Sequence, residues 1–243
     1  MEDGQTVYFD AEDRVATGTL AQELQGAEAL QIRGPKSWRW ISLPVSGAAE
    51  NVNRIRFKVQ SAAGGALSGS VAITLSGTRA EHFRDEATGD SPAALEKYAL
   101  QWLDSNAAPG LSFSNTKISE LTQPDLPLGI TADFEWAGAL KKRGSKSILS
   151  AFPWLGGPRS KDMIPERRLA EVEFGPPATF VTDLELPRAW LKSGPPLATV
   201  EGPGIHYRRE AAQAENHWTI SRTLTREGLH GVKEYAEMRK ALS

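Results

Sequence analysis

The chemistry open to this chain is limited by its reactive side chains. The 243 residues include no cysteine and only four histidines. The lack of cysteine removes disulfides, thiolate metal ligands and a cysteine nucleophile from this chain, and histidine is the usual acid or base at neutral pH. A chain with so few reactive side chains is not expected to be an enzyme by itself.

Three of the histidines lie in regular segments that carry no recognisable motif. His82 falls in a predicted amphipathic helix, whereas His206 and His217 fall on predicted strands beside large apolar residues. Histidines at such positions are more often half-exposed structural residues than catalytic ones. The enzymatic alternative is a stand-alone hydrolase that uses His82 or His217 with a serine or a carboxylate, and a pocket that holds such a group within hydrogen-bond reach would favour it.

The sequence has no spacing typical of a metal or phosphate site. It contains neither a His-x-x-x-His pair nor an Asp-x-Asp-x-Asp loop. Glu171 and Glu173 share one side of a predicted strand, which in an antiparallel sheet is most often the solvated side. The glycine pairs at 64–65 and 156–157 lack the strand and helix that frame a phosphate loop, so we interpret them as turns. We expect neither a metal ion nor a cofactor.

One cluster combines basic and aromatic residues. Lys141, Lys142 and Arg143 lie in a glycine-containing loop between two predicted strands, and Trp136 and Trp154 flank that loop. Solvated hairpin tips commonly carry such charges. If the chain binds a peptide or another partner, this is the surface where we expect it.

The chain also has seven tryptophans, of which Trp38 and Trp40 share one face of a predicted strand. Aromatic surfaces bind carbohydrate or peptide, but core packing is the commoner role, so we expect these side chains to be buried. A carbohydrate-binding β-sandwich is an alternative that requires an exposed planar strip of tryptophans. Burial of Trp38, Trp40, Trp136 and Trp218 would exclude it.

Composition limits the possible partners. Hydrophobic residues make up 40% and charged residues 24% of the chain, which is typical of globular proteins. The net charge of -2 gives no field that could hold nucleic acid, so we expect no nucleic-acid partner. No stretch approaches the ~20 apolar residues of a membrane span, and residues 1–4 lack the features of a signal peptide.

Alternation of apolar and polar residues dominates the first half of the chain. Residues 53–60 and 67–75 alternate around Gly64 and Gly65, which predicts a β-hairpin over 53–75. Apolar residues then recur at helical spacing from Ser91 and Pro92 to Leu103, so we predict a helix there and a shorter one over 77–84. A further strand is predicted over 111–120.

The second half begins after a proline-containing turn at 122–127 and again reads as strands. We predict them over 130–136, 169–174, 179–186, 204–210 and 217–224, with a long surface loop over 151–167 and a helix over 232–242. Many short strands between Pro/Gly turns are typical of a β-sandwich. The predicted fold class is mainly β (α+β), with two β-rich domains. The first has a helical pair after its hairpin, and the second is sandwich-like and ends in a helix.

Two series of residues extend over nearly the whole chain. The first comprises Gly4–Asp10, Gly18–Leu20, Gln25–Leu30, Leu43, Pro44, Asn51, Asn53, Gly77, Ala80 and Arg84. The second comprises Leu184–Pro187, Tyr207, Thr223, Leu224, Tyr235 and Met238–Leu242. In order and spacing they resemble the region downstream of the catalytic core in large bacterial transglutaminase-like proteins, which are predicted cysteine hydrolases with β-rich domains on either side of the core.

The resemblance implies that the catalytic core lies outside this chain. In that family a histidine activates a cysteine nucleophile, and an aspartate orients the imidazole. Asp10 resembles that aspartate, although the family usually continues Asp-Pro-Thr where this chain has Asp10-Ala11-Glu12. The cysteine and histidine would precede Met1. The resemblance then divides the chain into a core remnant and linker at 1–26, a β-rich domain with two helices at 27–126 and the sandwich-like domain at 127–243.

The function that follows is a non-catalytic C-terminal region. It would pack against the transglutaminase-like core and present a surface to a peptide or a cell-envelope component, for example by adding an extended segment to an edge strand. Relatives of this kind usually carry secretion signals or membrane segments, so the resemblance implies a periplasmic or membrane-associated parent protein, with no membrane insertion by this chain.

Overall fold

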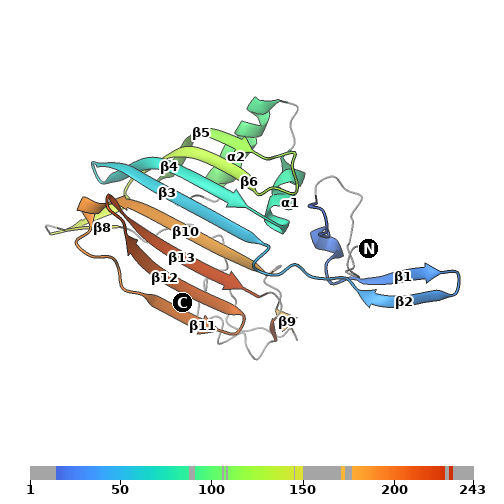
Figure 1. The fold of residues 1–243 in the computed structure, drawn as a ribbon. Helices are drawn as coiled ribbons and strands as arrows, with labels where there is room; N and C mark the ends of the chain where they lie inside the picture. Colours follow the sequence, from blue (N-terminus) through green and yellow to red (C-terminus); the bar gives the residue numbers. More distant parts are fainter. Residues whose placement is uncertain are drawn as a thin grey trace.

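One mixed sheet of eight strands organises the chain (Figure 1). The computed structural model describes residues 15–87, 91–105, 107, 109–144, 146–149, 171–172, 177–227 and 230–231. The sheet has the strand order β11-β12-β13-β10-β3-β4-β6-β5. The prediction of a mainly β fold is therefore confirmed.

The first half of the sheet is antiparallel and follows the predicted elements closely. Its strands are β3 (Val52–Ala63), β4 (Ala66–Leu75), β5 (Leu111–Ser119) and β6 (Leu128–Trp136). The predicted hairpin is confirmed as β3–β4, and its turn uses Gly64 and Gly65 at φ 59° and 89°, a backbone conformation that glycine adopts without strain.

The other half of the sheet comes from the second half of the chain. It consists of β10 (Ala178–Pro187), β11 (Ala198–Gly202), β12 (Ile205–Gln213) and β13 (His217–Arg226). β10 pairs in parallel with β3, and β11, β12 and β13 continue from it as antiparallel neighbours. Strands on both sides of the predicted boundary at 126/127 thus share one sheet.

This arrangement differs from the separate sandwich-like domain expected over 127–243. β6 joins β4 and β5, and β10 joins β3, so two strands of this region pair with the first half of the chain. β11, β12 and β13 extend the same sheet from β10. Alternation shows that a strand has one buried face, but it does not show which strand lies beside it. The predicted loop at 151–167 and helix at 232–242 lie outside the described residues.

Both predicted helices of the first half are confirmed, as α1 (Thr78–Glu86) and α2 (Pro92–Ser105). The backbone N–H of Thr78 donates to Asn51 Oδ1 at 2.9 Å, which satisfies one free donor of the first turn of α1. Ser91 accepts from the backbone N–H of Ala94 at 3.3 Å at the start of α2. Phe83 of α1 packs edge-on against Tyr98 and Trp102 of α2.

The two faces of the sheet differ in chemistry. The inner face meets the helices in one apolar core that includes Ile55, Phe57 and Phe134 from the strands and Phe83 and Leu103 from the helices. The outer face carries the alternate residues of the same strands, which are mainly charged or hydroxyl-bearing. Burial of the inner face stabilises the fold at roughly 25 cal/mol per Å² of apolar surface.

Short elements lie outside the main sheet. Two hairpins are formed by β1 (Glu28–Gly34) with β2 (Ser37–Ser42) and by β7 (Leu140–Arg143) with β8 (Lys146–Leu149). A small pair joins β9 (Glu171–Val172) to β14 (His230–Gly231). The 3-10 turns are η1 (Gln22–Leu24) and η3 (Arg188–Trp190). The β1–β2 hairpin extends away from the sheet (Figure 1).

Candidate functional site

The described residues of the predicted binding surface do not come together on one surface. Trp136 lies on β6 with its side chain in the core, opposite Leu67 and Leu111. Lys141, Lys142 and Arg143 lie exposed on β7. Trp154 and the predicted triad remnant Asp10 lie outside the described residues. The basic cluster is therefore a solvated hairpin strand. The Trp136 side chain is buried and cannot form a common surface with it.

The histidines named for the hydrolase alternative have no described hydroxyl partner. The exposed His82 ring lies 3.4 Å from Glu86 Oε1, one turn further along α1. No hydrogen bond of the His217 ring is found within the part of the chain that the structure describes. These placements give the hydrolase alternative no support.

His206 has the more developed environment, on the outer face of β12. Its Nδ1 contacts Glu201 of β11, and its Nε2 lies 3.3 Å from Glu227 Oε1, just after β13. The hydrogen bond with Glu201 raises the pKa of His206, partial burial opposes this, and Glu227 adds to the rise. Protonated His206 thus ties together three neighbouring segments at this side of the sheet. Across the described ranges, no cluster of His, Asp and Glu is suited to a metal ion.

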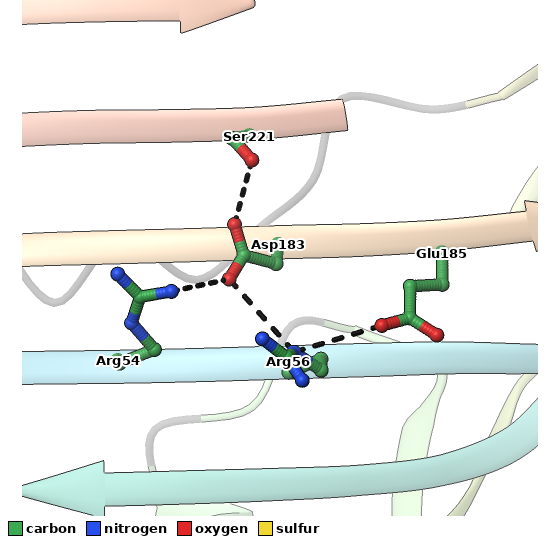
Figure 2. Close-up of polar contacts among 5 residues, drawn as sticks. All are labelled: Arg54, Arg56, Asp183, Glu185 and Ser221. Atoms are coloured by element: carbon green, nitrogen blue, oxygen red, sulfur yellow. Dashed lines mark hydrogen bonds and ion pairs between the residues drawn. The ribbon is translucent and has the colours of Figure 1, made fainter. Parts of the chain in front are cut away.

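A charged network crosses the centre of the outer face (Figure 2). Asp183 of β10 accepts from Arg54 Nη1 at 3.1 Å and from Ser221 Oγ at 2.7 Å. Arg56 lies 4.0 Å from Asp183 and 3.6 Å from Glu185. The Asp183 side chain is only 5% exposed, whereas both arginines are about half exposed. The contacts link β3, β10 and β13, and they satisfy the buried carboxylate as a structural group.

The β1–β2 hairpin presents an apolar face to solvent. Leu30 pairs with Trp40 and Ile32 pairs with Trp38, so the four side chains share one face. Their exposed fractions are 45% for Leu30, 62% for Trp40, 70% for Ile32 and 64% for Trp38. Burial was expected for these tryptophans and is wrong for Trp38 and Trp40, while it is confirmed for Trp136 and Trp218.

The rest of this hairpin is basic. Gln31 accepts from Arg33 Nε at 3.2 Å and from Arg39 Nε at 2.9 Å, and Lys36 lies in the turn. With Glu28 the hairpin has three basic residues and one acidic residue, although the whole chain is slightly acidic. We call Leu30, Ile32, Trp38 and Trp40 the apolar hairpin face from here on.

Sequence reasoning identified half of this face, because Trp38 and Trp40 alternate with Arg39. Leu30 and Ile32 alternate with Gln31 in the same way on the other side of Gly34 and Pro35, and this symmetry is the signal that predicts one shared face. Alternation alone does not distinguish a face that packs on a core from one that meets solvent.

Large exposed apolar patches on a projecting element are typical of interaction sites. The described helices include none long and apolar enough to cross a bilayer. Comparison with models of known protein families, with curated proteins and with solved structures finds no match to this chain.

Proposed function

We propose that this chain is a non-catalytic interaction region that attaches to an anionic phospholipid surface through the apolar hairpin face. The observation that carries the proposal is the exposure of four large apolar side chains on one side of a projecting, basic hairpin. This gives a specific form to the cell-envelope partner implied by the resemblance to transglutaminase-like proteins.

Both faces of the hairpin suit a lipid interface. Tryptophan is enriched at the level of the headgroups, where its ring is half in contact with acyl chains. An amphipathic element that lies in this plane buries its apolar side while its basic side faces anionic headgroups. Each lysine or arginine near such a surface contributes about 1 kcal/mol, so Arg33, Lys36 and Arg39 strengthen binding only where the lipids are anionic.

The hairpin also has a reason to need a partner. Among the described elements, its two strands contact mainly each other. A two-stranded hairpin alone in water is marginally stable. Burial of the apolar hairpin face against a bilayer removes apolar surface from water and holds the two strands together.

The test is sedimentation of the full chain with vesicles of phosphatidylcholine mixed with phosphatidylglycerol. We expect the chain to sediment with these vesicles and to bind poorly to phosphatidylcholine alone. Changing Trp38→Ser and Trp40→Ser together abolishes binding, whereas the matched change Trp190→Ser leaves it intact, because Trp190 is an exposed tryptophan in η3. Equal binding by the two variants contradicts the proposal.

A charge exchange separates this surface from the basic cluster of β7. Arg33→Glu with Lys36→Glu weakens binding to the anionic vesicles and makes it less sensitive to salt. Lys141→Glu with Lys142→Glu changes the same number of charges on the other hairpin and has a much smaller effect. A larger effect of the changes at Lys141 and Lys142 would contradict the proposal and indicate that the basic cluster of β7 is the binding surface.

The same proposal includes a transglutaminase-like core as the protein partner. β5 and β11 are the outer strands of the main sheet and can each accept an extended segment by strand addition. In this arrangement the core or a peptide packs on the sheet, and the parent protein is periplasmic or membrane-associated. Co-purification of this chain with a separately expressed core of that class tests it, and failure of the two to associate contradicts it.

Carbohydrate binding is a second candidate because Trp38 and Trp40 are exposed on one strand face. Two indoles two residues apart on one strand can stack on successive sugar rings. A glycan array separates the two functions: saturable glycan binding that is lost in Trp38→Ser, without vesicle binding, would replace the lipid proposal.

A further inference from the structure

Two arginines lie directly opposite each other on the inner face of β12 and β13. These strands belong to the main sheet, away from which the β1–β2 hairpin extends (Figure 1). Arg209 of β12 is directly opposite Arg222 of β13, and Arg222 is directly opposite Thr182 of β10. The three side chains form one row across neighbouring strands. The adjacent Arg208 faces the outer side and pairs with Glu210 at 2.7 Å.

The row lines a groove of about 500 Å³. Leucines and Ile220 form most of its apolar surface, and residues 193–196 form one wall. Gly194 fixes that wall, because a Cβ there would come within 2.7 Å of Ala211 Cβ and 2.8 Å of the Trp218 ring. The volume falls within the range of about 300–1,000 Å³ that is typical of small-molecule sites.

The two guanidinium groups lack carboxylate partners in the part of the chain that the structure describes. Arg209 donates from Nη2 to the Pro196 carbonyl at 3.3 Å, but its Nε is buried without a hydrogen bond. No described group forms a hydrogen bond or ion pair with Arg222. The acidic residues of these strands, Asp183, Glu185 and Glu210, alternate to the outer face.

Two like charges in this position are unfavourable for the free protein. Like charges directly opposite on neighbouring strands destabilise a sheet. Burial lowers the pKa of Arg222, Tyr207 raises it, and the Arg209 charge lowers it further. An anion placed between the two guanidinium groups would reverse the repulsion and satisfy their free donors.

We propose that this groove binds a small amphipathic oxyanion, a carboxylate or a phosphate monoester carried on an unbranched apolar chain. The head lies between Arg209 and Arg222, and the chain lies along Leu184, Leu186 and Ile220. This site is independent of the lipid-docking function proposed above, since its residues are on other elements and it takes a single molecule.

The experiment is isothermal titration calorimetry of the full chain with n-octanoate and with octyl phosphate, each as monomer. We expect saturable binding of at least one of these two anions. The one that binds more tightly shows whether the groove prefers a carboxylate or a phosphate group. Octanol lacks the charge and acetate lacks the chain, so both bind much more weakly. Octanol that binds as tightly as the better of the two anions overturns the proposal, and so does the absence of saturable binding by both anions.

Two variants test whether Arg222 binds the anion. Arg222→Gln removes charge-assisted hydrogen bonds and weakens binding of the tighter of the two anions about tenfold or more. Arg208→Gln is the matched control, because it removes the same charge from the opposite face of the same sheet and leaves binding unchanged. Equal affinities of the two variants overturn the assignment.

Stability without ligand gives a second readout. Arg222→Gln relieves the repulsion between Arg209 and Arg222, so the free variant melts at the same temperature as the original chain or higher. A large fall in melting temperature would show that Arg222 is already paired within the protein, and it would overturn the proposal.

Discussion

Asp183 of β10 holds side chains from its two neighbouring strands, β3 and β13, at the centre of the outer sheet face. Replacing it by asparagine keeps its size and removes the charge that Arg54 and Ser221 contact. Hydrogen bonds to charged groups contribute about 1.5–3 kcal/mol, so we expect Asp183→Asn to lower the free energy of unfolding by that amount in urea denaturation.

Glu185 provides the matched control on the same strand face. It is more exposed than Asp183, and within the described residues its one ion pair is with Arg56, at 3.6 Å. Glu185→Gln should therefore cost less than about 1 kcal/mol, as exposed ion pairs do. Two variants of equal stability would show that the network adds little to the fold.

His206 gives the stability a pH dependence with a defined sign. Because Glu201 raises its pKa above 6.5 in the folded state, the folded protein holds this proton more tightly than the unfolded chain does. The stabilisation is complete below pH 6.5 and is lost as the pH rises through the folded pKa.

An NMR titration of the His206 ring measures this pKa directly. We expect a value above 6.5 in the original chain and a lower value in Glu201→Gln, because the hydrogen bond with Glu201 is the main cause of the shift. The same pKa in both proteins would contradict this assignment.

Single residues were predicted well where alternation determines their direction. The alternation over residues 53–60 predicts that Ile55 and Phe57 are buried and that Arg56 is exposed, and they are. It does not distinguish Trp38 from Trp136, because both occupy the apolar positions of alternating strands. The difference comes from what lies opposite each face, which depends on residues distant in the sequence.

The β1–β2 hairpin is an element whose removal should not disturb the rest. Its strands contact mainly each other. Replacing residues 29–41 by two glycines should leave the melting temperature of the main sheet nearly unchanged and abolish vesicle binding. Circular dichroism and vesicle sedimentation on the same sample check both expectations, and a large loss of stability would show that the hairpin supports the sheet.

Elements with strong local signals could be predicted with nearly correct bounds. The glycine pair and two alternating runs fix β3–β4, and Ser91 with Pro92 marks the start of α2. The pairing of β1 with β2 was missed although Trp38 and Trp40 were assigned to a strand. The two-residue turn of Pro35 and Lys36 contains no glycine, unlike the turns that signal hairpins most strongly.

At the scale of the whole molecule, the shared sheet predicts cooperative unfolding. β3 pairs with β4 on one side and with β10 on the other, so neither half of the sheet can unfold without exposing the edge of the other. We expect one calorimetric transition, with coincident midpoints for circular dichroism and tryptophan fluorescence. Two separate transitions would support a domain boundary at 126/127.

The joining of the two halves could not be predicted because the β3–β10 contact is nonlocal. Its strongest local features are the charges of Arg54, Arg56 and Asp183, and these equally suit a solvated strand face. Several predicted strands show the same alternation, so the pattern does not indicate which of them pairs with β3.

The parallel pairing also has a consequence for synthesis on the ribosome. β3 and β4 can fold together soon after they emerge, but one edge of β3 must wait until β10 has been made. Meanwhile that edge is open to strands of other nascent chains. Arg54, Arg56 and Lys58 alternate along it and give it a repulsive charge of the kind that discourages edge-to-edge aggregation. Arg54 and Arg56, which contact Asp183 in the finished sheet, would thus first protect the free edge of β3 against aggregation.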